Sequence, residues 1–428
     1  MKSIVYLCRN LTLGKLIRLE NGKYYIQNQE TADLVAKFGS PLYVYDGNKI
    51  EEQIERMRKA FSGVDIKLKY ACKALTNLSI MKLMLKNGVD VDVVSIEEVK
   101  IALHVGFKPN QIQYTPSGVA FSEIEEALEL GIRLNVDSLD LLEKVGQKYG
   151  NAHPIAIRLN PSIMAGGNLK ISTGHADSKF GIPIEYIDEI IAIVTAYDLK
   201  VVGLHQHNGS DFKDSFVIVQ AMKKSMQVAE KYFPNLEFID MGSGFKVSYH
   251  ADDHVTDIEE LAEDVVKEFN AFCKRYGRDI QLWFEPGKYL VSESGTMFTT
   301  CNVTKHNPRR NFVHVDSGLN HLIRPMMYDA YQDIVNTSNT DESDTENYDI
   351  VGYICETDTF GSDRILPKVS QGDILAIKNA GAYCFSMSSN YNSRVRPAEV
   401  LVYNGKTYLI RERETMADIL RNQPEIDF

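Results

Sequence analysis

The chain has 428 residues, of which 44% are hydrophobic and 25% are charged, and its formal net charge is -11. This composition is that of a globular protein long enough for two domains, or for one large barrel with an appended domain. The acidic balance argues against binding to nucleic acids or anionic membranes, because both partners need basic surfaces. The N-terminus has no signal-peptide core and no apolar run reaches membrane-spanning length, so we expect a cytoplasmic protein without a membrane partner.

The cysteine pattern predicts neither disulfides nor a metal site. No two cysteines stand in a CxxC pair, and none has a metal-ligand spacing. We expect mostly buried, reduced thiols. The six residues are Cys8, Cys72, Cys273, Cys301, Cys355 and Cys384.

The first 45 residues contain a hairpin-like stretch in which Asn21-Gly22 separates Leu16–Glu20 from Lys23–Gln27. Asn-Gly is a strong signal for a two-residue hairpin turn. We expect residues 1–45 to join a β domain formed by the C-terminal part of the chain.

Short β-branched runs alternate with amphipathic helical patterns from about residue 47 to residue 290. Eight strands alternating with helices over this length fit a (β/α)8 barrel, which we place at residues 46–292. A doubly wound sheet is the competing architecture. The expected strands are Ile66–Tyr70, Gly88–Val94, Ile112–Tyr114, Leu134–Asp137, Ile155–Leu159, Lys200–His205, Leu236–Asp240 and Gln281–Phe284.

The remaining residues, 293–428, are rich in predicted strands and should form the C-terminal β domain. Asn404-Gly405 between the last two runs predicts a further hairpin. Residues 336–347 are polar, acidic and without apolar anchors, which predicts a mobile surface loop. The expected strands are Phe298–Thr304, Phe312–Val315, Asp349–Ile354, Asp373–Lys378, Ala398–Tyr403 and Lys406–Arg411.

Lys73 directly follows the first barrel strand, in Tyr70-Ala71-Cys72-Lys73-Ala74-Leu75. Catalytic groups gather where the strands of such a barrel end. Burial at this place would lower the pKa of the amine and make it nucleophilic. A surface lysine that opens a helix is the alternative.

Two histidines, His205 and His207, follow the sixth barrel strand. Their spacing would suit a metal, but no third ligand stands at an obvious spacing. The alternative is an imidazole that lies against a flat ligand, with Gly209-Ser210 offering amide and hydroxyl donors. After the seventh strand, Gly242-Ser243-Gly244 suggests a phosphate cup, because loops after strands seven and eight of a barrel commonly bind phosphate.

Glu285 follows the eighth strand and is held by the rigid turn Pro286-Gly287. A buried carboxylate needs a partner, and a protonated ring nitrogen would serve. An amine, a stacking imidazole, a phosphate cup and a carboxylate together meet the four recognition needs of pyridoxal 5'-phosphate. These needs are the aldehyde, the ring face, the phosphate and the pyridinium nitrogen.

Nearly the whole chain resembles the fold-type III pyridoxal-phosphate decarboxylases, most closely the diaminopimelate decarboxylase family. The order of the shared motifs is highly specific, although each motif alone is modest. They are Pro41-Leu42-Tyr43-Val44-Tyr45-Asp46, Tyr70–Ala74, Asp92–Ser95, Arg158–Pro161, Ile171–Gly174, Ser178–Gly181, the His/Gly/Ser and Glu-Pro-Gly segments, and Ser386–Asn392. The resemblance implies an alanine-racemase-like barrel inserted into a β domain, and a head-to-tail homodimer with active sites at the subunit interface.

The resemblance also implies how the cofactor is held. Lys73 would be the catalytic lysine that forms the Schiff base, His207 would stack on the ring, and Glu285 would pair with the ring nitrogen. The remaining expected cofactor contacts are Ser210, Gly242, Ser243, Gly244, Gly287 and Tyr383.

A second set of residues is implied for an amino-acid substrate. Arg324 and Tyr328 would bind its distal carboxylate, which a guanidinium recognises bidentately. Glu356 would bind the distal ammonium, and Cys355 from the partner subunit would donate the proton that replaces carbon dioxide. Lys288 and Tyr383 complete the expected substrate contacts. Without the resemblance, Arg324 and Glu356 would be surface ion-pair residues and Cys355 a buried structural thiol.

The chain departs from the family pattern at several positions. Lys288 stands where the family has arginine, so its contact loses the guanidinium fork. Ser243 replaces a glycine, which is tolerable only if that position does not need a positive φ. Cys-Glu-Thr-Asp-Thr at residues 355–359 replaces Cys-Glu-Ser-Gly-Asp, and Asn208 replaces an apolar residue.

The activity implied is the decarboxylation of meso-2,6-diaminopimelate to L-lysine and carbon dioxide, the last step of lysine biosynthesis. The first alternative is a decarboxylase of another basic amino acid or polyamine precursor, such as ornithine, lysine, arginine or carboxynorspermidine. A second is a non-catalytic regulator of the same fold. The retention of Lys73, His207 and Glu285 favours an enzyme.

Overall fold

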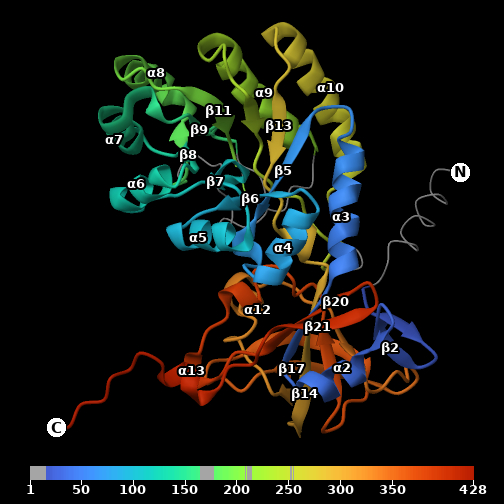
Figure 1. Cartoon of the computed structure of the whole chain (residues 1–428). Helices are drawn as coiled ribbons and strands as arrows, with labels where there is room; N and C mark the ends of the chain where they lie inside the picture. The colour runs from blue at the N-terminus through green and yellow to red at the C-terminus, as the bar shows by residue number, and fades with distance from the viewer. Residues whose placement is uncertain (1–15, 164–177, 208, 210–214, 251–252, 254) are drawn as a thin grey trace, which may run out of the picture. The chain divides into compact units, whose positions relative to one another are not determined.

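A computed structural model describes residues 16–163, 178–207, 209, 215–250, 253 and 255–428. The chain divides into two compact units (Figure 1). One contains Glu51–Ser292, and the other joins the chain up to Ile50 with Glu293–Phe428. The first boundary falls inside a helix, α3 (Gly47–Ala60). Two segments far apart in the sequence therefore share one unit.

The Glu51–Ser292 unit is a closed barrel of eight parallel strands. Their order is β9-β11-β12-β13-β5-β6-β7-β8, and β8 pairs with β9 to close the ring. A short ninth strand, β10 (Ile182–Pro183), pairs with β9 outside the ring. The barrel strands are β5 (Ile66–Ala71), β6 (Asp90–Val93), β7 (Ile112–Tyr114), β8 (Arg133–Val136), β9 (Ile155–Asn160), β11 (Val201–His205), β12 (Phe238–Asp240) and β13 (Gln281–Phe284).

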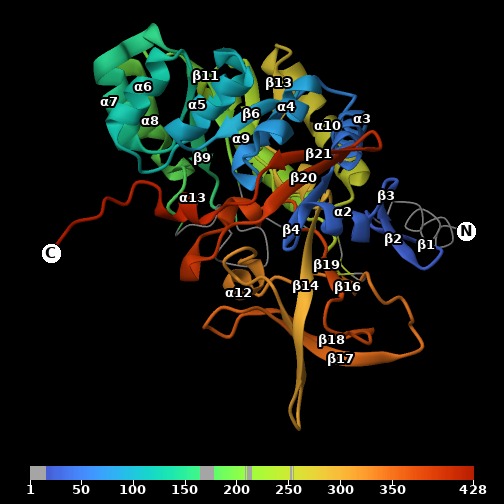
Figure 2. The same cartoon turned by 60° about the horizontal axis from the view of Figure 1, so that its bottom comes forward.

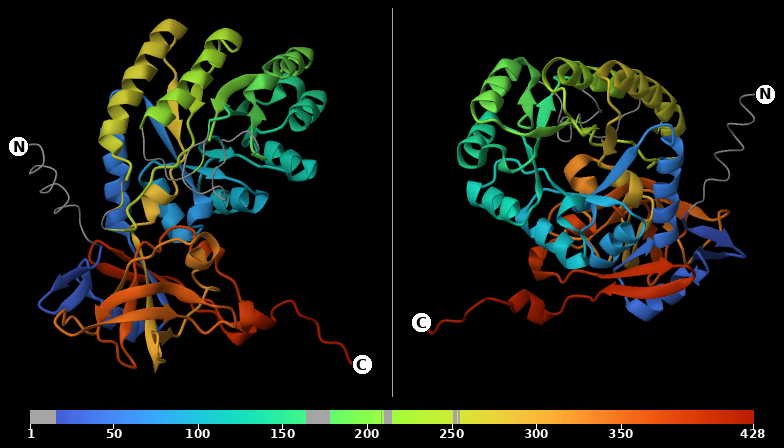
Figure 3. Two further views of the ribbon diagram at one scale, coloured as in Figure 1. Left: turned by 180° about the vertical axis from the view of Figure 1, so that it is seen from behind. Right: turned by 45° about the horizontal axis from the view of Figure 1, so that its top comes forward.

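Helices surround this ring, as the tilted view in Figure 3 shows. Several of them begin at an N-cap residue. The side chain of Ser95 accepts a hydrogen bond from the backbone N–H of Glu98, and that of Ser138 accepts one from the backbone N–H of Leu141. The helices are α3, α4 (Leu78–Lys86), α5 (Ile96–Val105), α6 (Phe121–Glu129), α7 (Leu139–Tyr149), α8 (Ile187–Ala196), α9 (Ser215–Tyr232), α10 (Ile258–Tyr276) and α11 (Lys288–Val291). The predicted barrel is confirmed and the doubly wound alternative is wrong, because an open sheet has no pairing between its outermost strands.

The second unit is rich in strands (Figure 2). Its larger sheet has the order β18-β17-β15-β14-β4-β20-β21, with β19 also pairing with β14 and β16 with β19. The strands are β4 (Leu42–Asp46), β14 (Gly295–His306), β15 (Asn311–Val315), β16 (Ile334–Asn336), β17 (Thr345–Val351), β18 (Thr359–Pro367), β19 (Ile374–Ile377), β20 (Ala398–Tyr403) and β21 (Lys406–Arg411). The predicted hairpin at Asn404-Gly405 joins β20 to β21, and the two residues have φ of 50° and 72°.

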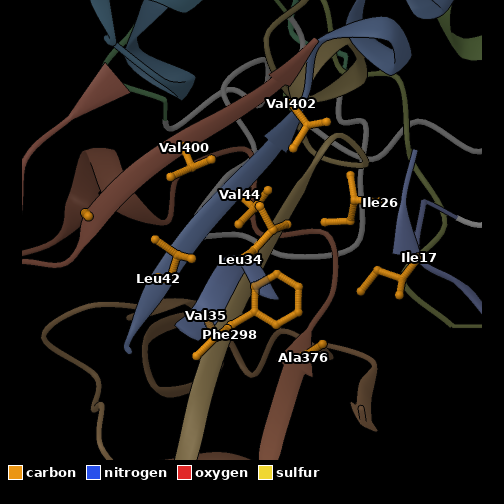
Figure 4. Packing of buried hydrophobic residues seen from close by; sticks show 11 residues of the cluster. Ile17, Ile26, Leu34, Val35, Leu42, Val44, Phe298, Ala376, Val400 and Val402 are labelled. Carbon is orange, nitrogen blue, oxygen red and sulfur yellow. The ribbon is translucent and has the colours of Figure 1, made fainter. Parts of the chain in front are cut away.

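The N-terminal segment belongs to this unit through both pairing and packing. It forms β1 (Arg18–Glu20), β2 (Lys23–Ile26), β3 (Gln29–Glu30) and α2 (Thr31–Phe38) before β4. Strand β4 lies between β14 and β20, antiparallel to the first and parallel to the second. Figure 4 shows Leu42 and Val44 of β4 packed with Phe298, Val400 and Val402 in one buried cluster. The burial of these apolar surfaces stabilises the packing of the N-terminal segment against the C-terminal strands.

The polar segment 336–347 is a loop only in its middle, because Asn336 ends β16 and residues 345–347 begin β17. Hydrogen-bonded turns connect the two strands. Asn336 Oδ1 accepts the backbone N–H groups of Ser338 and Asn339, and Asp341 Oδ1 accepts that of Ser343. Such turns satisfy a backbone that has no apolar anchor. Its mobility stays a prediction. No helix within the described residues combines the length and the apolar character needed to cross a membrane.

Candidate active site

Lys73 lies in a short 3-10 turn, η1 (Cys72–Ala74), directly after β5. Its Nζ is 3.5 Å from Oδ2 of Asp92, which lies on the neighbouring strand β6. The side chain of Lys73 is 42% exposed. The prediction that this amine is buried is therefore wrong. The carboxylate of Asp92 therefore lies beside the amine.

Asp92 is a buried acid that can hold a proton near neutral pH. It is 1% exposed, and burial together with the negative charge of Glu285 raises the pKa of its carboxyl to about 7. Oδ1 of Asp92 has no hydrogen-bond partner among the described residues. Asp92 can therefore exchange a proton with the amine of Lys73 across their 3.5 Å contact.

Glu285 and His205 form a buried hydrogen-bonded pair at the ends of β13 and β11. The distance from His205 Nε2 to Glu285 Oε2 is 3.2 Å. Burial favours the uncharged form of Glu285, but the hydrogen bond from His205 and the positive charge of Lys73 nearby hold the pKa of this carboxyl well below its usual range. Burial lowers the pKa of His205. A neutral His205 thus donates its Nε2–H to an ionised Glu285.

Asp240, at the end of β12, completes a buried cluster with this pair. The ligand-type atoms of His205, Asp240 and Glu285 all lie within 4.8 Å of one another. Oδ1 of Asp240 accepts the backbone N–H of Gly242, while burial and the charge of Glu285 raise the pKa of Asp240 well above its usual value. The positive charge of Lys73 already interacts with Glu285. This charge disfavours the binding of a further cation by the three residues.

The glycine-rich turn packs directly against His207. The backbone N–H of Ser243 donates to His207 Nδ1 at 3.2 Å, so the ring carries its proton on Nε2. Burial lowers the pKa of His207 to about 3, which keeps the imidazole neutral. Gly242 has φ of 63°, and a Cβ there would lie 2.6 Å from His207 Nδ1. Ser243 does not have a positive φ, so a serine is tolerable at this position in place of the family's glycine.

Two further residues of the expected site, Gly287 and Lys288, follow β13. Gly287 is buried, and a Cβ on it would meet Ala71 and Ala74 at 3.2 Å, so the turn after Glu285 packs tightly against the segment that carries Lys73. Lys288 begins α11 and is half-buried. Ser210 and Asn208 lie outside the described residues.

Apart from Lys288, the expected substrate residues lie in the second unit. Arg324 and Tyr328 are the first and last residues of α12 (Arg324–Tyr328), a spacing that places both on one helix face. Arg324 is 7% exposed and Tyr328 is half-buried, so Arg324 is not a surface ion-pair residue. Tyr383 is half-buried and has φ of 57°, a backbone conformation that is costly for a tyrosine.

Cys355 and Glu356 lie side by side in the loop between β17 and β18, and both are exposed. The alternative of a buried structural thiol is therefore wrong for Cys355. Cys72, Cys273, Cys301 and Cys384 are buried, and none of the cysteines in the described part of the chain forms a disulfide. Cys8 lies outside the described residues.

Four charged or ionisable residues that the barrel brings together were not among the expected cofactor or substrate contacts, although His205 was considered with His207 as a metal ligand. Asp92, Arg158, His205 and Asp240 are all buried, and each contributes to the electrostatic environment of Glu285 or of its neighbours. Their common signal was visible: each lies at or near the carboxyl end of a predicted barrel strand. A charged residue at that end of a barrel strand points to catalysis or binding rather than to stability alone.

The described residues fit pyridoxal 5'-phosphate. Glu285 Oε1 is buried and has no hydrogen-bond partner among them, which suits a protonated ring nitrogen. His207 is neutral and fixed by the glycine-rich turn, so it can lie against an aromatic ring. The amine of Lys73 is exposed enough to react with an aldehyde.

Comparison with known proteins identifies the family. The family model for the pyridoxal-binding domain of pyridoxal-dependent decarboxylases matches residues 47–292. The diaminopimelate decarboxylase of Methanothermobacter thermautotrophicus is 38% identical over 412 residues, which cover 94% of this chain and 96% of the relative. That of Archaeoglobus fulgidus is 37% identical over 411 residues, which cover 94% of this chain and 97% of the relative.

Solved structures agree with this result. The crystal structure of diaminopimelate decarboxylase from M. jannaschii with L-lysine has a TM-score of 0.87 and 31% identity, covering 96% of this chain and 98% of that chain. The crystal structure of the Helicobacter pylori diaminopimelate decarboxylase with L-lysine has a TM-score of 0.83 and 34% identity, covering 91% of this chain and 98% of that chain. The resemblance inferred from the sequence is confirmed: this chain belongs to the diaminopimelate decarboxylase family of pyridoxal-dependent decarboxylases.

Proposed function

We propose that this chain decarboxylates meso-2,6-diaminopimelate to L-lysine and carbon dioxide, the last step of lysine biosynthesis, with pyridoxal 5'-phosphate as cofactor. The observation that carries the choice of substrate is Arg324, a buried guanidinium one helical turn from Tyr328. Diaminopimelate has a second carboxylate that such a group can bind bidentately, whereas ornithine and lysine have none. The diaminopimelate decarboxylase of Methanothermobacter thermautotrophicus, 38% identical over 94% of this chain, supports the same choice.

The cofactor would be held by residues of the barrel. Lys73 would bind its aldehyde, His207 would lie against its ring, and the charged carboxylate of Glu285 would bind its ring nitrogen. The phosphate would be held by Ser210, Gly242, Ser243, Gly244, Gly287 and Tyr383. When bound, pyridoxal phosphate supplies an electron sink for the pair of electrons left behind as carbon dioxide departs.

Each proton in this scheme has a residue to hold it. Glu285, kept ionised by the hydrogen bond from His205, would stabilise a proton on the ring nitrogen. Asp92, whose pKa is raised to about 7 by burial, would take up and return the proton of the Lys73 amine. Cys355 would donate the proton that takes the place of carbon dioxide and would regain one from solvent.

The substrate would be bound by Lys288, Arg324, Tyr328, Glu356 and Tyr383. Arg324 and Tyr328 would hold its distal carboxylate and Glu356 its distal ammonium. We propose that the enzyme is a homodimer in which Cys355 and Glu356 reach the active site of the partner subunit. The free thiols of all described cysteines are in keeping with a reducing cytoplasm, where we place the enzyme.

The test is carbon dioxide release from a panel of diaminopimelate stereoisomers, ornithine, lysine, arginine and carboxynorspermidine. We expect release from the meso isomer above all others. Release from ornithine or lysine but not from diaminopimelate would transfer the assignment to the first alternative, a basic amino-acid decarboxylase.

The Arg324→Ala variant tests the substrate contact itself. The loss of a charge-assisted hydrogen bond, about 1.5–3 kcal/mol, should raise the KM for diaminopimelate about 10- to 100-fold. An unchanged KM would contradict the role of Arg324. Lys288→Arg, which restores the guanidinium fork of the family pattern, is the matched variant that should keep the KM low.

A further inference from the structure

A turn near the C-terminus contacts the two side chains of the loop between β17 and β18. The hydroxyl of Tyr391 donates to Glu356 Oε1 at 2.6 Å, and Nδ2 of Asn392 donates to Cys355 Sγ at 3.4 Å. Consecutive residues of one segment thus contact consecutive residues of another, 35 and 37 positions earlier in the chain. All four lie in the same unit.

The turn is held in an unfavourable backbone conformation. Asn392 and Ser393 have φ of 57° and 52°, so two successive residues other than glycine adopt the left-handed region. Such residues cost free energy and persist only where the surroundings impose them, often at functional sites. The base of the turn is fixed by Asn390, whose Nδ2 donates to the carbonyl of Arg394 at 3.0 Å and to Oε2 of Glu414 at 2.6 Å.

The loop that carries Cys355 and Glu356 has a rigid backbone of its own. The buried carboxylate of Asp358 accepts the backbone N–H groups of Leu319 at 2.7 Å and Ile354 at 3.0 Å. Gly352 has no space for a side chain, because a Cβ there would lie 2.2 Å from Asp358 Oδ2. The backbone of the loop is therefore fixed without help from the turn, and only the exposed side chains of Cys355 and Glu356 remain to be oriented.

We propose that Tyr391 and Asn392 are positioning residues, Tyr391 for the carboxylate of Glu356 and Asn392 for the thiol of Cys355. The inference rests on the proposed function, in which Glu356 binds the substrate and Cys355 donates a proton. An exposed side chain samples several rotamers, and a hydrogen bond that selects one of them removes that entropy before the substrate arrives. The two hydrogen bonds therefore serve different steps: Tyr391 acts on binding and Asn392 on the proton transfer.

Kinetics of two variants separate these effects. Tyr391→Phe removes only the hydroxyl, and Asn392→Gly removes the side chain with its amide while accepting the left-handed backbone. One net hydrogen bond corresponds to a change of about 3- to 10-fold. We expect Tyr391→Phe to raise the KM for diaminopimelate by this factor with kcat kept, and Asn392→Gly to lower kcat by this factor with KM kept. Asn422→Gly is the matched control, since Asn422 also has a positive φ, of 63°.

A second readout does not depend on turnover. Cys355 is the exposed cysteine of the described residues, and its alkylation by iodoacetamide can be followed by peptide mass in the full-length holoenzyme. An amide donor stabilises the thiolate, which is the reactive form. Asn392→Gly should therefore slow alkylation of Cys355 about threefold, in line with the loss of one hydrogen bond, while Tyr391→Phe and Asn422→Gly leave it unchanged.

Two results would overturn the positioning role of Tyr391 and Asn392. Equal changes of KM and kcat in both variants, with a lowered melting temperature, would show a purely structural turn and overturn the proposal. Unchanged kinetics and unchanged alkylation in both would do the same. If the wild-type protein released no carbon dioxide from diaminopimelate, the proposed function would fail, and the alkylation rates would then decide the positioning of Cys355 by Asn392.

Discussion

At the scale of single residues, the barrel mouth is organised by buried charges that neutralise one another. Glu285 stays ionised because His205 donates to one of its oxygens, although burial favours the neutral acid. His205 itself is held neutral by burial. Its Nδ1 has no hydrogen-bond partner among the described residues, which agrees with a proton on Nε2. The other carboxylate oxygen, Oε1 of Glu285, is buried and has no hydrogen-bond partner among the described residues.

We expect His205→Leu to weaken cofactor binding. Without its donor, Glu285 shifts toward the protonated form and loses its fixed orientation. A hydrogen bond to a charged group contributes about 1.5–3 kcal/mol, so the dissociation constant for pyridoxal phosphate should rise about 10- to 100-fold. Absorbance titration of the apoprotein measures it. His205→Gln, which keeps an amide donor near the position of Nε2, should lose much less, and equal losses in both variants would contradict the role of the donor.

Residues that act through local chemistry could be named from the sequence. Lys73 and Glu285 were found because each directly follows an apolar strand. Asp92 received no role and His205 was considered only as a metal ligand, because their importance depends on charges contributed by other strands. His205 and Glu285 are 80 residues apart in the chain but 3.2 Å apart in space. The exposure of Lys73 was also missed, since burial follows from neighbours that a strand pattern does not specify.

At the scale of elements, strand β5 places a buried lysine, Lys69, in the barrel interior. Lys69 is 1% exposed, and its Nζ lies 3.6 Å from Asp90 Oδ2 and 4.3 Å from the centroid of the Trp283 ring. Arg133 of β8 lies over the same ring, so strands from opposite sides of the barrel meet there. The interior is a packed layer rather than a pore. Burial lowers the pKa of Lys69 to about 8.

We expect Lys69→Met to remove a pH dependence of stability. The pKa of Lys69 is about 8 in the folded protein, below its unfolded value. The unfolded chain therefore binds more protons between these values, about 8 and about 10.4, and the free energy of unfolding rises with pH in that window. In Lys69→Met this rise should be absent. Near neutral pH the variant should be at least as stable as the wild type, because Asp90 keeps Lys67 at 3.0 Å.

Thermal unfolding at about pH 7 and about pH 9.5 tests this expectation. Lys67→Met, in which the more exposed partner of Asp90 is removed, is the control that should retain the rise of stability with pH. A Lys69→Met protein that gains the same stability between the two pH values as the wild type would contradict a buried, partly deprotonated Lys69.

At the scale of the whole molecule, the N-terminal segment and the C-terminal strands form one unit, interrupted by the barrel. Strand β4 pairs with β14 and β20, whose first residues are more than 250 and 350 positions away in the chain. Such non-local pairing forms late in folding, because a long loop must close first. The Arg324, Cys355 and Glu356 side chains belong to this unit, whereas Lys73 and Glu285 belong to the barrel.

Subunit mixing tests the proposed homodimer. Lys73→Ala and Cys355→Ala should each be nearly inactive alone. If every active site combines Lys73 of one subunit with Cys355 of the other, a mixed dimer has one intact site, and an equal mixture should regain about a quarter of wild-type activity. Mixing after mild dissociation, with carbon dioxide release as the readout, measures this. No recovery despite formation of mixed dimers would place both residues in one subunit's site.

The sequence by itself determined the eight barrel strands, the strand-rich C-terminal part and the lysine, histidine and glutamate that suit pyridoxal phosphate. These features depend on hydrophobic periodicity and on residues adjacent in the chain, which a sequence displays directly. Only the tertiary structure decided that Ser243 avoids a positive φ, that Asp92 accompanies Lys73 and that Tyr391 and Asn392 contact Glu356 and Cys355. Protonation and orientation are set by side chains from distant segments, and folding alone brings those together.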